Sequence, residues 1–180
     1  METFTAVFSE VRVIVPARNE ADSLYSDGYG SFSGENRVLA LDSFEGLYLV
    51  ERGKITVIDE ESHERLVFKE MLLKVSSGDP FNWTRYIIYK DLRTRGFVAK
   101  RGPGNGVDFL VYERGSHGRK PPRYLVYAIW EGSQEPLKHL SDVLAGAKAE
   151  GRVLRLAVVD RRGEIVYYTL SEMGLERGGP

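Results

Sequence analysis

Three strand-like segments follow one another in the second half of the chain, with no room for a helix between them. They are FVAKRG (97–102), VDFLVYERG (107–115) and RYLVYAIWEG (123–132), all rich in β-branched and aromatic residues. The loops that separate them contain glycine and proline, which favour turns. Parallel neighbours need a long crossover connection, so this close spacing predicts an antiparallel meander.

Helical patterns stand on both sides of this meander. Pro80 suits the first turn of a helix that precedes it, and a second helix is predicted for 136–151. The expected apolar face of the first helix consists of Trp83, Ile87, Ile88 and Leu92. Two further strands follow, at 154–160 and 164–170. The order α-β-β-β-α-β-β predicts a mixed sheet with a helix on each face or end.

The first half of the chain alternates short strands and helices. The predicted strands are 11–15, 36–41 and 54–59, and the predicted helices begin at Asn19, at Asp42 and at Ser62. Asp42 followed by Glu45 has the spacing of a capping box. The run SSGDP (76–80) breaks the pattern. We therefore predict a mixed α/β (α+β) protein with a small N-terminal domain at 1–78 and a second domain at 79–180.

Composition narrows the class of protein. No apolar run approaches the ~20 residues of a membrane span, and the first ten residues lack a basic segment followed by an apolar one. The chain contains no cysteine, so a reducing cytoplasm is expected and structural zinc sites lose their usual ligands. Because the net charge is only -1, a nucleic-acid surface would have to be a local basic cluster. The tail 171–180 is expected to be frayed.

The motifs, in their order, resemble the archaeal tRNA-splicing endonuclease subunit over nearly the whole chain. In the C-terminal half the resemblance rests on YKDLRTRGFVAKRGPGNGVDFLVYERG, RYLVYAIWEG and LRLAVVDRRGEIVYYTL. In the N-terminal half it rests on RVIV, SLYSDGYG and FEGLYLVERGKITV. The resemblance implies a restriction-endonuclease-like C-terminal domain and metal-independent cleavage without a cofactor. The implied substrate is a bulge-helix-bulge motif in precursor tRNA, cut to a 2′,3′-cyclic phosphate and a 5′-hydroxyl.

The family assigns this cleavage to a tyrosine, a histidine and a lysine. The resemblance places the tyrosine at Tyr112, but the histidine position is Pro121 and the lysine position is Arg152. Proline has no proton to give, and arginine keeps the charge with a different shape. Ala145 stands where the family usually has an arginine that holds a bulged base. These departures indicate a structural subunit with only a remnant of the catalytic set.

As a structural subunit the chain would join a catalytic endonuclease subunit in a heterotetramer with two copies of each. The resemblance implies that the loop 160–164 contacts an opposing subunit, through the carboxylates of Asp160 and Glu164. Both faces of the strand EIVYYTL, which contains Tyr167, are apolar enough to be buried in such an interface. RNA contact is expected from basic residues in the loops around the meander, namely Lys100, Arg101, Arg114, Arg119, Lys120 and Arg123.

Three alternatives remain open at this point. The chain is itself catalytic if His117, in the same loop as Pro121, replaces the lost acid, whereas His63 and His139 are expected to be surface residues. A metal-dependent nuclease would use Asp108 and Glu113, but the neighbouring lysine that such enzymes need is absent. An RNA-binding scaffold outside splicing would leave the full-length resemblance unexplained.

Overall fold

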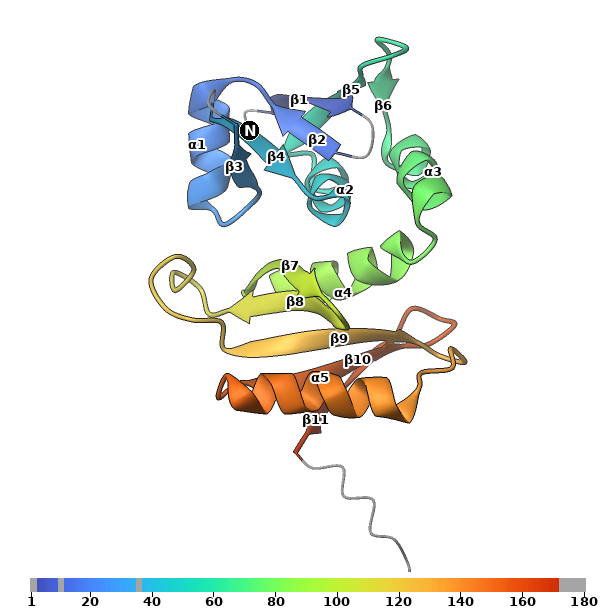
Figure 1. The fold of residues 1–180 in the computed structure, drawn as a ribbon. Coiled ribbons are helices and arrows are strands. Elements are labelled where there is room, and N and C mark those ends of the chain that lie inside the picture. Colours follow the sequence, from blue (N-terminus) through green and yellow to red (C-terminus); the bar gives the residue numbers. More distant parts are fainter. Residues whose placement is uncertain (1–2, 10–11, 35–36, 172–180) are drawn as a thin grey trace, which may run out of the picture. The chain divides into compact units, whose positions relative to one another are not determined.

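The computed structural model describes residues 3–9, 12–34 and 37–171. The chain divides into two compact units, residues 1–100 and 101–180, each with its own sheet (Figure 1). The expected fraying at 171–180 concerns a segment that, apart from Ser171, lies outside the described residues. The mixed α+β class predicted from the sequence is confirmed.

The N-terminal unit contains a six-stranded sheet with the order β3-β4-β2-β1-β5-β6. Its strands are β1 (Phe4–Ser9), β2 (Arg12–Val15), β3 (Ser31–Ser33), β4 (Val38–Leu41), β5 (Ile55–Asp59) and β6 (Arg65–Leu66). Strand β1, which the sequence analysis missed, pairs antiparallel with β2 and parallel with β5. Its alternation of buried Ala6 and Phe8 with more exposed neighbours is the period of two that marks a strand.

Four helices complete this unit: α1 (Arg18–Ser26), α2 (Ser43–Glu51), α3 (Phe68–Gly78) and α4 (Asn82–Thr94). The predicted capping box of α2 is present, and the carboxylate of Glu45 accepts the backbone N–H of Asp42 at 3.0 Å. Two other helix starts were wrong. Ala17, and not Asn19, is the N-cap residue of α1, and α3 begins at Phe68 because β6 occupies part of the stretch predicted as helix from Ser62.

Helix α4 buries Ile88 and Leu92 of the predicted apolar face, but two tyrosines belong to its buried face as well. Its buried side chains include Tyr86, Ile88, Tyr89 and Leu92, whereas Trp83 is partly exposed. The helix packs on α2, where the Tyr89 ring centroid lies 4.9 Å from that of Phe44. Aromatic rings from two helices therefore form the centre of the packing, and a simple count of aliphatic residues did not reveal it.

A buried acidic residue ties three segments of the N-terminal unit together. Both carboxylate oxygens of Glu45 lie 3.1 Å from the backbone nitrogen of Gly30, and the ammonium of Lys100 lies 3.2 Å from one of them. Lys100 also donates to the carbonyl of Gly30 at 2.7 Å. Burial raises the pKa of Glu45, and the charge of Lys100 opposes that rise. Lys100 is thus engaged in the protein interior and does not belong to the predicted basic loop cluster.

The C-terminal unit has a five-stranded mixed sheet with the order β11-β10-β9-β8-β7. Its strands are β7 (Val98–Gly104), whose first residues fall before the unit boundary, β8 (Val107–Tyr112), β9 (Tyr124–Trp130), β10 (Val153–Val159) and β11 (Ile165–Leu170). Strands β8 and β9 are antiparallel, as the meander predicted, and β10 lies parallel to β9. Helix α5 (Leu137–Ala149) makes the crossover between these parallel strands.

One face of this sheet is covered by α5 (Figure 1). The core between them consists of Leu125, Tyr127, Val143, Leu144, Ala147 and Leu154. The β7–β8 turn lies against this core at Gly106, where an added Cβ would come within 2.6 Å of the Tyr127 ring. The α-β-β-β-α-β-β order therefore yields a sheet with a well-packed helical face.

Candidate functional site

The three positions that the resemblance assigns to chemistry gather at one end of the C-terminal sheet. Tyr112 is the last residue of β8, Pro121 precedes β9, and Arg152 precedes β10. Strand β8 runs antiparallel to β9, with Val111 opposite Tyr124, and β9 runs parallel to β10. The end of β8 and the starts of β9 and β10 therefore meet at the same edge.

The loop between β8 and β9 carries His117 back to Tyr112. Their ring centroids are 4.9 Å apart at an interplanar angle of 84°, an edge-to-face contact. A short turn holds this path, because Ser116 donates from its backbone and hydroxyl to the carbonyl of Glu113, and Lys120 donates to the carbonyl of Ser116. Gly118 supports the turn with a φ of 77°. Both His117 and Tyr112 are half-buried.

Arg152 is held beside the two prolines. Its Nη1 donates to the carbonyl of Pro122 at 3.4 Å, and its Nε lies 3.0 Å from a carboxylate oxygen of Glu150. The guanidinium is thus near Pro121, but two of its N–H donors already bind acceptors in the same chain. Ala145 lies on the exposed face of α5 and offers no charged group.

The other two histidines differ from one another. His63 is exposed in the turn between β5 and β6, as expected. His139 is only half-exposed, since its ring packs against Tyr127 with a centroid distance of 6.0 Å. The expectation that His139 is a simple surface residue was therefore wrong. The phenol of Tyr127 donates to Glu135 at 2.5 Å beside it.

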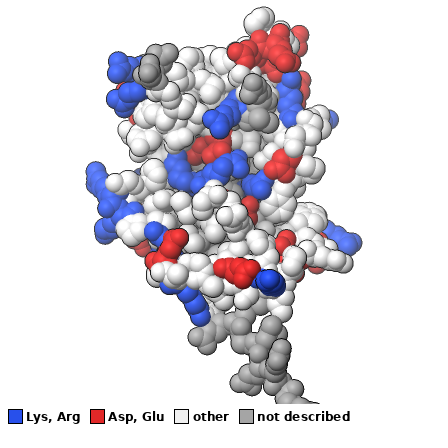
Figure 2. All heavy atoms as spheres, in the orientation of Figure 1, with Lys and Arg blue, Asp and Glu red and all other residues white. Residues whose placement is uncertain are grey.

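Apart from Lys100, the predicted RNA-contacting residues are exposed, but they differ in the partners that they contact. Arg119 and Lys120 lie in the β8–β9 loop, over which Figure 2 shows a group of basic side chains. Arg123 forms an ion pair of 2.7 Å with Glu113, and both side chains are more than half exposed. Arg101 lies on β7. A surface pair of this kind contributes little to stability, so Arg123 can exchange its partner for a phosphate at low cost.

The loop predicted to contact a partner subunit uses one of its carboxylates internally. Oδ1 of Asp160 accepts the backbone N–H groups of Arg162 and Glu164, both at 2.8 Å. Glu131 accepts the backbone N–H of Arg161 at 3.3 Å. Glu164 and the two arginines are exposed. The outward charge of this turn is therefore mixed, and its contact with an opposing subunit stays a prediction.

Strand β11 has one covered face and one exposed face. Tyr167 lies opposite Ala157 and is half-buried, whereas Val166 and Tyr168 are 51% and 54% exposed. Within the chain only one face is covered, so the predicted burial of both faces in a subunit interface stays a prediction. Because β11 is also the last strand of its sheet, its outer edge has no neighbouring strand among the described residues.

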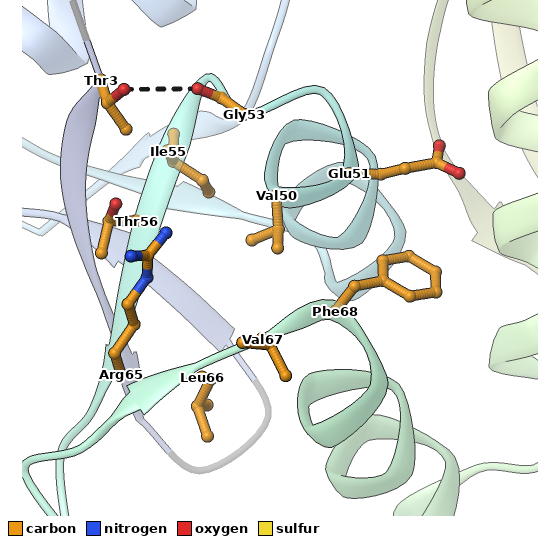
Figure 3. Close-up of a pocket in the computed structure, with 10 residues that line it drawn as sticks. All are labelled: Thr3, Val50, Glu51, Gly53, Ile55, Thr56, Arg65, Leu66, Val67 and Phe68. Carbon is orange, nitrogen blue, oxygen red and sulfur yellow. Dashed lines mark hydrogen bonds between the residues drawn. The ribbon is translucent and has the colours of Figure 1, made fainter.

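A groove of about 620 Å³ lies in the N-terminal unit, far along the chain from these residues (Figure 3). Its walls come from the end of α2, from β5 and from the segment where β6 leads into α3, including Ile55, Arg65 and Phe68. In Figure 3 the Arg65 side chain runs along β5 towards Thr56. None of the residues predicted for chemistry or RNA contact lines it.

Neither a metal site nor a membrane-spanning helix is found among the described residues. Within residues 3–9, 12–34 and 37–171, no three histidine or acidic side chains come together in a way that could hold a metal ion. Asp108 uses a carboxylate oxygen to accept the backbone N–H of Ala128 at 2.8 Å. In the same described residues, none of the helices is long and apolar enough to cross a membrane.

Comparison with known protein families places both units. Residues 4–72 match the model of the tRNA intron endonuclease N-terminal domain, and residues 82–167 match that of the tRNA intron endonuclease catalytic C-terminal domain. The predicted boundary between residues 78 and 79 stays a prediction, because the compact units divide after residue 100 and the family models leave residues 73–81 unmatched.

Several known proteins are similar to this chain in sequence. The tRNA-splicing endonuclease of Methanococcus maripaludis is 30% identical over 97% of this chain and 97% of its own length. That of Pyrococcus horikoshii is 32% identical over 87% of this chain and 89% of its own length. The tRNA-splicing endonuclease of Methanococcoides burtonii is 34% identical over 92% of this chain, which spans 45% of that longer protein. The chain belongs to the tRNA intron endonuclease family.

Proposed function

We propose that this chain is the structural, non-cleaving subunit of a tRNA-splicing endonuclease that removes introns from precursor tRNA in the cytoplasm. It assembles with a catalytic subunit, two copies of each. The names of the relatives support precursor tRNA as the substrate of the complex. The observation that carries the non-cleaving role is Pro121, which stands where the resemblance requires the general acid. Loss of general acid catalysis typically lowers a rate by ~10²–10⁴.

The state of Arg152 supports the same conclusion. A lysine in that place would present a point charge to the phosphoryl group, whereas Arg152 pairs with Glu150 and donates to Pro122. To stabilise the growing charge, the guanidinium would have to give up these partners and turn towards the RNA. A cation that must reorganise offsets transition-state charge less well than one already in place.

The exposed face of β11 supports assembly. Val166 and Tyr168 lie on an edge strand, and an apolar edge strand is a favourable surface for pairing with another chain. Leu137, at the start of α5, is 49% exposed and adds apolar surface to the same unit. Glu164 and the two arginines of the neighbouring turn provide charges at the margin of this surface, as is usual for the rim of an interface.

Reconstitution tests the proposal. The purified chain should leave an intron-containing precursor uncut. Its mixture with the catalytic subunit that co-purifies with it from native cells should release an intron with a 5′-hydroxyl and a 2′,3′-cyclic phosphate. In that mixture Tyr112→Phe should leave the rate unchanged. Cleavage by the single chain at a rate near that of the complex would refute the structural role. The mass of the native complex tests the heterotetramer.

The edge-to-face contact between Tyr112 and His117 favours a second candidate. It brings an imidazole to the phenol that the family uses, so the chain would itself be catalytic with His117 as the displaced acid. Under this alternative, His117→Ala in the complex lowers the cleavage rate by ~10² or more, and Tyr112→Phe lowers it as well. His63→Asn, at an exposed histidine of the other unit, serves as the control for the loss of an imidazole. Unchanged rates for both site variants would eliminate the catalytic alternative.

A further inference from the structure

Two aromatic rings, tilted by 43° to one another, and an arginine lie together at the surface of the N-terminal unit. The ring centroids of Tyr25, near the end of α1, and Phe32, in the middle of β3, are 4.7 Å apart. The guanidinium carbon of Arg37 lies 4.9 Å from the centroid of the Phe32 ring. Figure 1 shows β3 beside α1, so the two rings come from adjacent elements. Arg37 directly precedes β4. These three residues are called the aromatic platform below.

The platform faces solvent. Tyr25 is 43% exposed, Phe32 is half-buried, and Arg37 is exposed. Phe32 is anchored in the unit, because β3 pairs with β4 and places Phe32 opposite the buried Leu39. A rigid ring is thus held from below, while the tyrosine and the guanidinium beside it keep surface that a flat ligand can cover.

The charges around the platform are asymmetric. Arg37 contacts the Phe32 ring, and Arg18 is exposed at the first residue of α1. Because Val15 pairs with Leu39, the start of α1 and Arg37 lie at the same end of the sheet. Figure 2 shows basic side chains over α1. At the other end, Asp22 precedes Tyr25 by one helical turn. An anionic backbone would therefore pass on the arginine side.

We infer that the aromatic platform binds an unpaired nucleotide of RNA, with the base against Tyr25 and Phe32 and a phosphate at Arg37. Aromatic side chains and arginine planes are the surfaces on which single-stranded bases stack, and a nearby cation neutralises the backbone. A purely apolar partner would leave the guanidinium of Arg37 without a counter-charge. The inference rests on the proposed function only in the choice of RNA, because the platform lies in the other unit from Tyr112 and Arg152.

Binding of a short RNA by the full chain tests the inference. The probe is a fluorescein-labelled octa-adenylate, and the readout is fluorescence anisotropy at several salt concentrations. Tyr25→Ala should weaken binding about fivefold or more, the low end of the contribution of one stacked base. Tyr25→Phe should bind within about twofold of the unchanged chain, because the ring remains. Arg37→Ala should weaken binding and reduce the salt slope by about one phosphate contact.

Matched controls come from the same unit. Trp83→Ala removes another partly exposed ring, and Arg52→Ala removes another exposed cation. Both should bind within about twofold of the unchanged chain. Thermal unfolding checks that every variant is folded.

Several results would contradict RNA binding by the aromatic platform. They are absence of binding by the unchanged chain, unchanged binding by Tyr25→Ala, and equal weakening by Arg52→Ala and Arg37→Ala. A Tyr25→Ala variant that keeps its affinity for RNA but no longer joins the catalytic subunit would also overturn it, in favour of a protein contact. The assay contains neither precursor nor partner. Its failure therefore leaves the structural role in the endonuclease intact, and cleavage by the single chain would leave the platform intact.

Discussion

The ammonium of Lys100 lies 3.2 Å from the carboxylate of Glu45, whose residue is 1% exposed. Lys100→Met should lower the free energy of unfolding by about 3 kcal/mol, because it leaves a buried carboxylate without its cation. Urea unfolding of the full chain measures the change. Lys69→Met, at an exposed lysine of α3, is the control and should change the free energy by less than about 0.5 kcal/mol. Equal effects of the two variants would contradict the role of the ion pair.

The same carboxylate makes stability depend on pH. Burial raises the pKa of Glu45 in the folded chain, so the folded state binds its proton more tightly than the unfolded state does. Its contribution is therefore fully present below the unfolded pKa and is lost as pH rises through the folded pKa. Relative to Glu45→Gln, the unchanged chain should lose stability as the pH rises from 4 to 8. Parallel stability curves for the two proteins would show that Glu45 does not titrate differently on folding.

Asp59 makes stability depend on pH in the opposite direction. A hydrogen bond from Lys74 and backbone N–H groups of the following turn lower the pKa of Asp59 to about 2. The folded state therefore holds this proton less tightly, and the stabilisation is present above the unfolded pKa near 3.8 and is lost as pH falls through about 2. Lys74→Met should raise the pKa of Asp59, measured by NMR titration of its side-chain carbon. An unchanged midpoint would assign the shift to the backbone donors alone.

Alanine variants at two glycines of the β7–β8 turn can distinguish the cost of backbone strain from the cost of overpacking. Gly104 and Gly106 have φ values of 89° and 90°, but an added Cβ meets nothing within 4 Å at Gly104, whereas at Gly106 it comes within 2.6 Å of Tyr127 and 2.7 Å of Val143. Both alanine variants carry the cost of a left-handed residue. Gly106→Ala should cost about 1–3 kcal/mol more in unfolding free energy, because it overfills the core beneath α5. Equal losses of unfolding free energy in the two variants would show that the turn moves away from the core without cost.

How far the sequence alone predicts this fold depends on whether the signal is local. The capping box of Asp42 and Glu45 was predicted because its two hydrogen bonds lie within four residues. The start of α3 was wrong because Arg65 and Leu66 pair with β5, a contact that helical spacing does not encode. Ile88 and Leu92 of α4 are buried as predicted. Tyr89 joins them because it packs against the rings of Phe44 and Tyr48 on α2, whereas Trp83 is partly exposed.

The candidate site shows the same division. The predicted strands place Tyr112 at the end of one strand and Arg152 just before another. The strand order and register that bring them to one edge of the sheet come from the structure. The contact between Tyr112 and His117 depends on the path of a loop with glycine at positive φ, which spacing does not determine. The internal use of Asp160 was likewise not foreseen, although an aspartate followed by a turn is a recognised signal for bonds to its own backbone.

The exposed face of β11 gives the last prediction. Val166→Glu places a charge on the apolar edge strand opposite Val158, and it should prevent association with the catalytic subunit while leaving the fold of the single chain intact. A buried unpaired charge would cost the complex several kcal/mol, whereas in the free chain the glutamate stays in water. Light scattering of the mixture measures the mass of the complex. Val67→Glu, at an equally exposed valine of the N-terminal unit, should assemble normally. If both variants failed to assemble, the effect of the added charge would not depend on its position. The result would then contradict a role of β11 in the interface.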